Sequence, residues 1–568
     1  MCAETKEHQL KVVLCWHMHQ PDYRGPAHSE YQLPWVYLHS IKDYTDMIAH
    51  LENEPEARAV VNFAPVLLEQ IDDYSRQISD WLQVGKLIND PLLAALAGPG
   101  LPIEQNERWA LVEACRRLND KLVDRFAPFR ELMGCLSWFD ERPESRIYLN
   151  DQAITDLLVW YHLAWMGESV RENDIRVKSL EKKARGFDLD DRRRLLALIG
   201  GIHSTLIGRY RRMAEQGRIE ISVSPYAHPI VPLLIDVDSA REAMPELNPL
   251  AFSTYPGGEA RARWHIRKGN TVFERFFGFS PAGCWPSEGA VSEDAFKLFE
   301  EEGYSWIASG QQVLNNSLHA SGMADPLPES WAHTPYRLHE GRLNCFFRDD
   351  GLSDLIGFTY SNWHADDAVG DLINNLVNIA DATADNRDAV VSIIMDGENA
   401  WECYPNNASY FLSALYKQLV EHPKIRLTTF SDCLERQQKS APALSSLTAG
   451  SWVYGSFSTW IGNQDKNRAW EMLSEAKVVY DKVLLQKEFS DKQLSALEIQ
   501  LATCEGSDWF WWFGDYNPGQ TVSDFERLFR HQLSHLYALL EVEAPEYLMH
   551  VFATGSGDPD LGGVMKRN

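Results

Sequence analysis

The chain has 568 residues, of which 45% are hydrophobic and 24% charged, a balance typical of globular proteins rather than disordered or fibrous ones. Its 54 Lys and Arg against 81 Asp and Glu give a formal net charge of −27. Because a nucleic-acid binder needs a basic surface to neutralise phosphates, we expect no nucleic-acid partner. A neutral polymer such as a polysaccharide is not repelled by this charge.

The N-terminal residues are polar and partly acidic, without the apolar run of a secretory signal. The longest apolar stretch, Leu157–Met166, is interrupted by His162 and is too short to cross a bilayer. The nine cysteines contain no CxxC pair, as in a reducing compartment. We therefore expect a cytoplasmic protein without a membrane partner.

Short apolar runs alternate with longer helical patterns such as Ser292–Glu302 and Asp366–Ile379. Apolar runs of this length are typical of buried strands in a parallel sheet. The alternation therefore predicts an α/β protein built from repeated βα units. The predicted strands are Lys11–Cys15, Ala59–Phe63, Ile219–Val223, Ser305–Ala308, Leu343–Phe347, Ala389–Met395 and Ile425–Thr429.

Two regions interrupt this alternation. Residues 90–217 have a helical period and no convincing strand, which predicts a helical insertion into a barrel formed by residues 1–89 and 218–438. Residues 440–448 resemble a linker, and the helical patterns Ala469–Gln486 and Ser523–Glu541 follow it. Residues 439–568 are therefore predicted to form a C-terminal helical domain.

Polar residues that follow a barrel strand lie where the active site of such a fold is built. His17 and His19 follow the first predicted strand, two residues apart and so on one face of an extended chain. They are interpreted as a metal-binding pair, as donors to sugar hydroxyls, or as structural histidines. His228 follows the third strand and is equally open between a structural and a functional role.

Two further segments carry carboxylates. Glu288 precedes a helix that Ser292 is expected to cap, so it is not explained by helix capping. Asp396 comes directly after an apolar strand, and Glu398 follows two residues later. The alternative for this second segment is a polar turn that requires Gly397 at positive φ.

Aromatic residues gather in polar, turn-rich segments. Trp285 precedes Glu288, Trp401 follows Asp396, and Trp460 belongs to the aromatic segment Trp452–Trp470. Flat amphipathic rings suit the apolar face of a sugar, although core packing and interdomain contacts are the ordinary alternatives.

Taken in order, these segments resemble glycoside hydrolase family 57 over nearly the whole chain. The segments that carry the resemblance are His17-Met18-His19-Gln20-Pro21, Ser224-Pro225-Tyr226-Ala227-His228-Pro229, Gly283-Cys284-Trp285-Pro286-Ser287-Glu288, Met395-Asp396-Gly397-Glu398-Asn399 and Trp452–Trp470. The resemblance implies an incomplete (β/α)7 barrel followed by a helical region.

The resemblance also implies a retaining mechanism on α-glucans, with Glu288 as nucleophile and Asp396 as general acid/base. His17, His19, His228, Trp285 and the aromatics that include Trp401 and Trp460 would shape the sugar subsites, and no cofactor or metal is expected.

Within the family, the Asp-Gly-Glu-Asn segment is most similar to amylopullulanases and α-amylases. A 4-α-glucanotransferase or branching activity is the alternative on the same scaffold. The alternatives from other classes are a metal-dependent hydrolase or deacetylase using His17, His19, His228 and Asp396, and a non-catalytic carbohydrate-binding protein. Two neighbouring acids must have separated pKa values, and we expect the raised pKa at Asp396.

Overall fold

The computed structural model describes residues 9–247, 254–323, 329–437 and 441–557. Its centre is a closed ring of parallel strands, because β7 and β8 pair with each other as well as with β5 and β1. Seven strands form this barrel, in the order β1 (Leu10–Met18), β2 (Ala59–Phe63), β3 (Ile219–Val223), β4 (Gly283–Cys284), β5 (Trp306–Gly310), β7 (Asn344–Arg348) and β8 (Val390–Asp396). The predicted (β/α)7 fold class is confirmed.

The strands form where the sequence predicts continuous apolar runs. β2 and β3 have the predicted bounds, and both are almost wholly buried. β1 is longer than predicted and includes His17, so this side chain projects from a strand rather than from a loop. β4 has two residues and carries no apolar run of its own, which is why no strand was predicted there.

Three short strands lie outside the ring. β6 (Tyr336–Leu338) pairs antiparallel with β7, and β9 (Ile425–Leu427) pairs with the start of β1. β10 (Ala443–Leu444) pairs with β6. The segment expected to be a linker therefore contributes a strand to the sheet, at least in its described part.

Helices cover the outside of the barrel, and their apolar faces form one core with the strands. They are α1 (Trp35–Ile41), α2 (Asp43–Asn53), α3 (Pro65–Val84), α12 (Val231–Ile235), α13 (Gly258–Phe277), α14 (Glu293–Glu301), α15 (Gln311–Ala320), α16 (Asp350–Asp354), α17 (Ala365–Ala382), α18 (Ser409–Glu421) and α19 (Phe430–Glu435). As predicted, Ser292 caps α14, and its side chain accepts a hydrogen bond from the backbone of Ala295.

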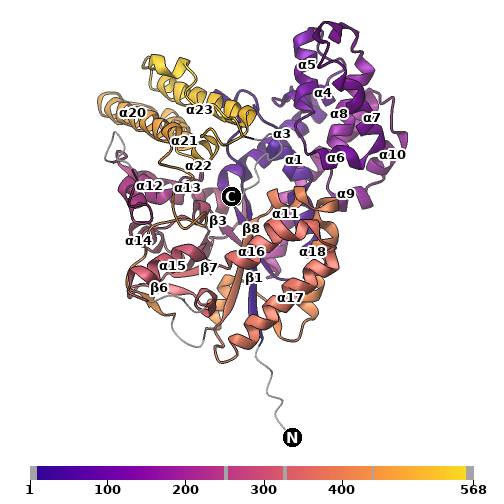
Figure 1. Cartoon of the computed structure of the whole chain (residues 1–568). Helices are drawn as coiled ribbons and strands as arrows, with labels where there is room; N and C mark the ends of the chain where they lie inside the picture. Colours follow the sequence, from indigo (N-terminus) through magenta and orange to yellow (C-terminus); the bar gives the residue numbers. More distant parts are fainter. Residues whose placement is uncertain (1–8, 248–253, 324–328, 438–440, 558–568) are drawn as a thin grey trace.

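Two further groups of helices rise above the barrel as separate lobes (Figure 1). Between β2 and β3 the chain forms one lobe from α4 (Pro91–Ala97), α5 (Gln105–Ala114), α6 (Asp120–Arg125), α7 (Ala127–Ser137), α8 (Asp151–Ala164), α9 (Glu168–Asn173) and α10 (Ile175–Lys183). The long helix α11 (Leu189–Glu215) then leads from this lobe back to the barrel, where it packs against α3 and β3. After β10 the chain forms α20 (Gln464–Gln486), α21 (Asp491–Cys504), α22 (Ser507–Trp512) and α23 (Gly519–Leu539), here called the C-terminal helices. The predicted domain boundaries stay predictions.

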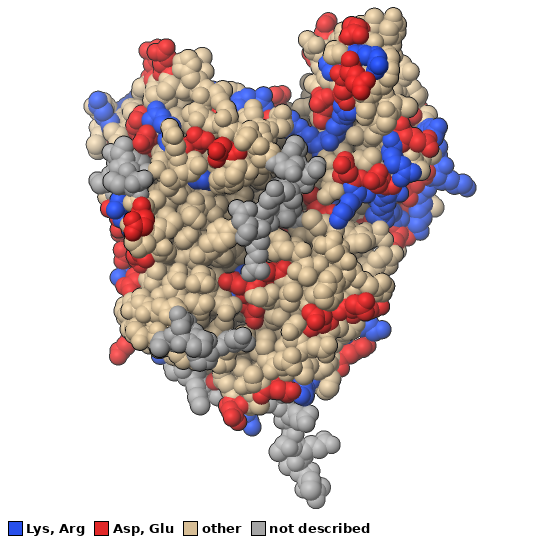
Figure 2. All heavy atoms as spheres, viewed as in Figure 1, with Lys and Arg blue, Asp and Glu red and all other residues tan. Residues whose placement is uncertain are grey.

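None of the described helices combines the length and the apolarity needed to span a membrane. On the face drawn in Figure 2, basic side chains gather on the lobe that contains α7 and α10. Acidic side chains are spread over both lobes and the barrel on the same face.

The turn after β8 requires a glycine because of packing. A Cβ atom on Gly397 would lie 2.2 Å from Sδ of Met18, which is fully buried on β1. The alternative explanation of this segment, a polar turn that requires Gly397 at positive φ, is wrong, since Gly397 is not among the residues with positive φ.

We predict that Gly397→Ala lowers the free energy of unfolding by about 1–3 kcal/mol, as overpacking of a core does. Denaturant unfolding measures this change. The matched control is Gly134→Ala in α7, where an added Cβ meets no atom within 4 Å and a gain of about 0.5–1 kcal/mol is expected. Equal behaviour of the two variants would contradict the packing argument.

Candidate active site

A row of polar side chains crosses the barrel mouth. Asp396, His17, Asn62 and Ser222 are register partners on β8, β1, β2 and β3, so their side chains lie on the same face of the sheet. His17 Nδ1 lies 2.7 Å from Oδ1 of Asn62, whose Nδ2 donates to Ser222 Oγ at 3.0 Å. Asn62 and Ser222 are fully buried. Sheet register therefore places Asp396 beside His17, and the hydrogen bonds of the row hold the His17 ring.

Three histidines stack at the centre of the mouth. Ring centroids are 5.6 Å apart for His17 and His19, 5.0 Å for His17 and His228, and 3.8 Å for His19 and His228. Each ring has one nitrogen at hydrogen-bond distance from a partner: Asn62 for His17, Asp508 for His19 and Ser507 for His228. Among the described residues, the other nitrogen of each ring is buried without a protein partner.

Burial keeps at least two of these rings neutral. Burial and the neighbouring His19 lower the pKa of His17 to about 3, against a smaller opposing effect of Asn62. Burial, His19 and His17 also hold the pKa of His228 well below its usual value. Neutral imidazoles offer lone pairs as well as N–H groups, so this cluster is suited to hydrogen bonds with hydroxyl groups.

The same three histidines are the donor set to consider for a metal, because one ring nitrogen from each lies within 4.8 Å of the others. A zinc ion must lie in the plane of every imidazole that binds it, about 2.0–2.1 Å from the nitrogen. The His19 and His228 rings are stacked at an angle of 22°. Their lone pairs run side by side and do not meet at one point, so the cluster as it stands does not fit a metal.

Glu288 is held in an unusual backbone conformation. It lies in the short 3-10 turn Ser287–Gly289 after β4, with a φ of 59°. Non-glycine residues in the left-handed region cost energy and gather at functional sites. Trp452 stabilises the turn, since its backbone N–H donates to the Glu288 carbonyl at 3.1 Å and its Nε1 donates to Glu288 Oε2 at 2.9 Å. The other carboxylate oxygen lies 3.8 Å from His228 Nδ1.

The environment of Glu288 disfavours its charge. Burial raises the pKa of Glu288 well above its usual value, the charges of Asp396 and Asp508 raise it further, and the hydrogen bond from Trp452 opposes them. The two predicted catalytic carboxyls therefore lie near enough to influence each other. The raised pKa that we expect at Asp396 stays a prediction, and burial together with the neighbouring charges raises that of Glu288 as well.

Glu398 lies behind the site and is 2% exposed. Its Oε1 accepts hydrogen bonds from the backbone N–H of His19 at 3.3 Å, from Gln20 Nε2 at 3.2 Å and from the Tyr44 hydroxyl at 3.3 Å. Burial, followed by the charges of Asp396 and Asp43, raises its pKa. These contacts show that Glu398 holds the loop after β1.

The predicted tryptophans differ in their positions. Trp285 lies in the cluster, with its ring centroid 5.2 Å from Trp452 and 6.2 Å from His17, and its Nε1 is buried without a partner in the part of the chain that the structure describes. Trp401 and Trp460 are 1% and 0% exposed. Trp401 packs edge-on against Trp16, and Trp460 packs against Trp511. Sugar contact by these two rings stays a prediction, and the structure shows them in core packing.

Two residues of the site come from the C-terminal helices and were not predicted. Ser507 and Asp508 begin α22. Ser507 contacts His228, which precedes it by 279 residues, and Asp508 contacts His19, which precedes it by 489 residues. Their sequence context, a Gly-Ser-Asp before five aromatic residues, was a signal that we did not use. Asn62 was also missed, as the only amide in an otherwise apolar strand.

The sequence model of glycosyl hydrolase family 57 matches residues 13–444. The chain belongs to this family. It is similar in structure to a GH57 branching enzyme from Thermococcus kodakaraensis, with a TM-score of 0.54, 15% identity, and coverage of 94% of this chain and 89% of the other. No curated protein matches the chain in sequence.

Two more solved structures share the fold of this family 57 chain. A GH57-type branching enzyme from Pyrococcus horikoshii has a TM-score of 0.55, 15% identity, and coverage of 95% of this chain and 96% of the other. The α-amylase AmyC from Thermotoga maritima has a TM-score of 0.55, 12% identity, and coverage of 95% of both chains. At these identities the likeness shows the fold alone.

The raised pKa of Glu288 predicts a stability gain when its charge is removed. A carboxyl whose pKa is raised on folding stabilises the protein in its protonated form, and this contribution is lost as the pH rises through the folded-state pKa. We expect Glu288→Gln, which keeps an acceptor for Trp452, to raise the melting temperature at pH 7 by roughly 1–2 °C.

Calorimetry at pH 4 and pH 7 measures this effect, which should shrink at pH 4. The control is Glu340→Gln, which removes an exposed carboxyl. A melting temperature at pH 7 that falls or stays constant in Glu288→Gln would show that the ionised carboxylate costs no stability.

Proposed function

We propose that the protein is a retaining glycoside hydrolase that cleaves α-glucans, with Glu288 as nucleophile and Asp396 as general acid/base. The observation that carries the proposal is the placement of the two carboxyls. β4 and β8 lie on opposite walls of the seven-strand ring, and the charge of Asp396 raises the pKa of Glu288. A sugar ring bound between them would face one carboxyl on each side.

The chemistry follows from this arrangement. Glu288 attacks the anomeric carbon as a carboxylate while Asp396 gives its proton to the glycosidic oxygen, which leaves with the bonding electron pair. With the proton of the pair on Asp396, the neighbouring charge that raises the pKa of Glu288 is absent, so Glu288 ionises more easily. In the second step Asp396 takes a proton from water, the water oxygen attacks the anomeric carbon, and the bond to Glu288 breaks. Two inversions retain the configuration, and such a pair works at a separation of about 5–5.5 Å.

The surroundings of the pair support a sugar substrate. The stacked histidines offer ring nitrogens without protein partners, which hydroxyl groups would satisfy. Trp285 and Trp452 supply apolar rings next to the same cluster. The α-glucan class is supported by the family and by the names of the solved relatives, which are branching enzymes, an α-amylase and a 4-α-glucanotransferase from Thermococcus litoralis.

Hydrolysis is preferred over transfer because the Asp396-Gly397-Glu398 segment is most similar to amylases and amylopullulanases. Transfer to a second glucan, as in a 4-α-glucanotransferase or branching enzyme, is the alternative, since water and a sugar hydroxyl compete for the same intermediate. A metal-dependent hydrolase is disfavoured by the stacking of His19 on His228. A non-catalytic sugar-binding protein would not need a strained carboxylate at Glu288.

We also propose that the protein works in the cytoplasm. All cysteines among the described residues are free thiols, and most of them are buried. Free thiols persist in a reducing compartment. The proposed substrate is an α-glucan or maltooligosaccharide, with no nucleic-acid or membrane partner.

The nucleophile is tested by chemical rescue. We expect Glu288→Gly to reduce kcat on maltoheptaose by roughly a thousandfold or more, because no other group can form the glycosyl-enzyme intermediate. Sodium azide should restore part of the activity and yield a β-glycosyl azide, identified by NMR. Activity near that of the wild type without azide would exclude Glu288 as nucleophile.

The companion variant tests the acid. Asp396→Ala should lower kcat on maltoheptaose far more than on α-glucosyl fluoride, because fluoride leaves without a proton. Equal losses on both substrates would argue against the acid role. In the wild type, products of maltoheptaose that are only shorter than the substrate indicate hydrolysis, and longer products indicate transfer.

A further inference from the structure

The C-terminal helices contact the histidine cluster through Ser507 and, with an acidic side chain, through Asp508. We propose that Asp508 is a positioning residue, which holds His19 in the tautomer that carries hydrogen on Nε2 and thereby presents the Nδ1 lone pair to a hydroxyl of the bound sugar. The inference rests on the proposed function, because it names a sugar as the group that His19 contacts. It assigns to the C-terminal helices a part in catalysis.

The contact between Asp508 and His19 is direct. His19 Nε2 lies 2.9 Å from Oδ1 and 3.0 Å from Oδ2 of Asp508. The two side chains are 11% and 14% exposed, so water screens the pair only weakly. An ionised carboxylate accepts hydrogen bonds and does not donate them, so His19 must carry its hydrogen on Nε2.

The other nitrogen of His19 is then defined. In this tautomer Nδ1 is the acceptor, and it is buried without a partner among the described residues. In His17 the two ring nitrogens have the opposite roles. Its Nδ1 lies 2.7 Å from Asn62 Oδ1, and its Nε2 is buried without a partner among the described residues. A buried acceptor without a partner is costly, and a hydroxyl donor from a substrate satisfies it.

Asp508 is placed by a rigid anchor next to it. Glu505, which is fully buried, accepts hydrogen bonds from Tyr255, from His265 and from two nitrogens of Arg261, at 2.6 to 3.1 Å. Burial alone would raise its pKa, but Arg261 and His265 outweigh burial and lower the pKa of Glu505 to about 2. This charged network joins the end of α21 to α13 of the barrel.

The turn between the anchor and Asp508 is equally constrained. A Cβ atom at Gly506 would lie 3.0 Å from the carbonyl oxygen of Ala227, so the turn packs closely against the segment that carries His228. The backbone N–H of Ser507 donates to the His228 carbonyl at 3.0 Å, and Ser507 Oγ lies 3.0 Å from His228 Nδ1. The same turn therefore contacts two histidines of the cluster.

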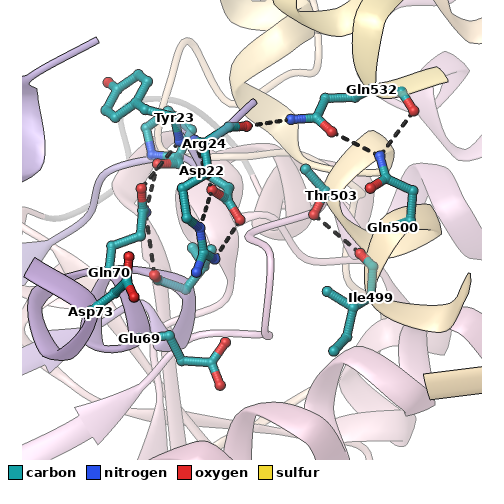
Figure 3. Close-up of polar contacts among 12 residues, drawn as sticks. Asp22, Tyr23, Arg24, Glu69, Gln70, Asp73, Ile499, Gln500, Thr503 and Gln532 are labelled. Atoms are coloured by element: carbon teal, nitrogen blue, oxygen red, sulfur yellow. Dashed lines mark hydrogen bonds and ion pairs between the residues drawn. The ribbon is translucent and has the colours of Figure 1, made fainter. Parts of the chain in front are cut away.

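A second contact joins the C-terminal helices to the loop that carries His19 (Figure 3). Gln500 Nε2 donates to Gln532 Oε1 at 2.8 Å, and Gln532 Nε2 donates to the Arg24 carbonyl at 2.7 Å. From the other side, Gln70 of α3 accepts from the Tyr23 backbone at 3.1 Å. Since the loop after β1 is held on both sides, the His19–Asp508 distance is fixed by the fold.

The test compares Asp508→Asn with the wild-type enzyme. The amide has nearly the same shape but can either donate to or accept from Nε2, so the tautomer is no longer fixed. We expect kcat/KM on maltoheptaose to fall roughly 10- to 100-fold, the size of one buried charge-assisted hydrogen bond. Asp508→Glu should recover part of this loss. The matched control is Asp515→Asn, an exposed aspartate in the same group of helices.

Two further readouts separate positioning from a merely structural role. Nitrogen-15 NMR of labelled histidine in the free protein should show His19 protonated on Nε2 in the wild type and a mixed population in Asp508→Asn. The charge of Asp508 also raises the pKa of Glu288. The acid limb of the kcat/KM profile should therefore move to lower pH in Asp508→Asn and stay unchanged in Asp515→Asn.

A double-mutant cycle gives the sharpest outcome. If Asp508 acts through His19, Asp508→Asn should cause little further loss of kcat/KM in a His19→Ala background. Additive losses, an unchanged His19 tautomer, or wild-type kcat/KM in Asp508→Asn would each overturn the proposal. The NMR readout needs no substrate, so it stands even if the wild-type protein has no activity on glucans and the proposed function fails.

Discussion

Closure of the parallel sheet is the constraint on which the site depends. Glu288 and Asp396 lie 396 − 288 = 108 residues apart, and only the pairing of β7 with β8 completes the ring that brings both to one mouth. The strands are buried apolar runs, so closure is stabilised by the hydrophobic effect along the whole barrel. Polar residues occur where the strands end, and register places Asp396, His17 and Asn62 side by side. The geometry of the site is therefore a consequence of sheet register.

Burial then sets the chemistry of the groups that closure brings together. Burial lowers the pKa of His17 and of His228 and raises the pKa of Glu288, in each case because a charged form loses its surrounding water. A site of this kind is costly for stability, as are the left-handed backbone of Glu288 and the unpartnered histidine nitrogens. These costs are concentrated where a substrate would relieve them. The same trade between stability and activity is common to enzyme sites.

The sequence predicted what depends on local pattern and failed where tertiary contacts decide. Ala59–Phe63 and Ile219–Val223 were predicted with their observed bounds, because a short apolar run admits little else in an α/β protein. β4 was missed because register with β3 and β5, and not its own two residues, makes it a strand. The polar ends of predicted strands identified Asp396 and the three histidines, and Glu288 was identified by its position before a helix that another residue caps. Nothing local reveals that Asp508 lies against His19, that Gly397 is required by Met18, or that Trp401 and Trp460 pack into the core.

The central claim is that Glu288 forms the covalent bond to the sugar at the barrel mouth. The most direct measurement is mass spectrometry of the protein after reaction with 5-fluoro-α-glucosyl fluoride, whose fluorine slows release of the intermediate. The account predicts that the peptide containing Glu288, and no other peptide, gains the mass of one fluoroglucosyl group. A label on Asp396, on Glu398 or on any other residue would contradict it.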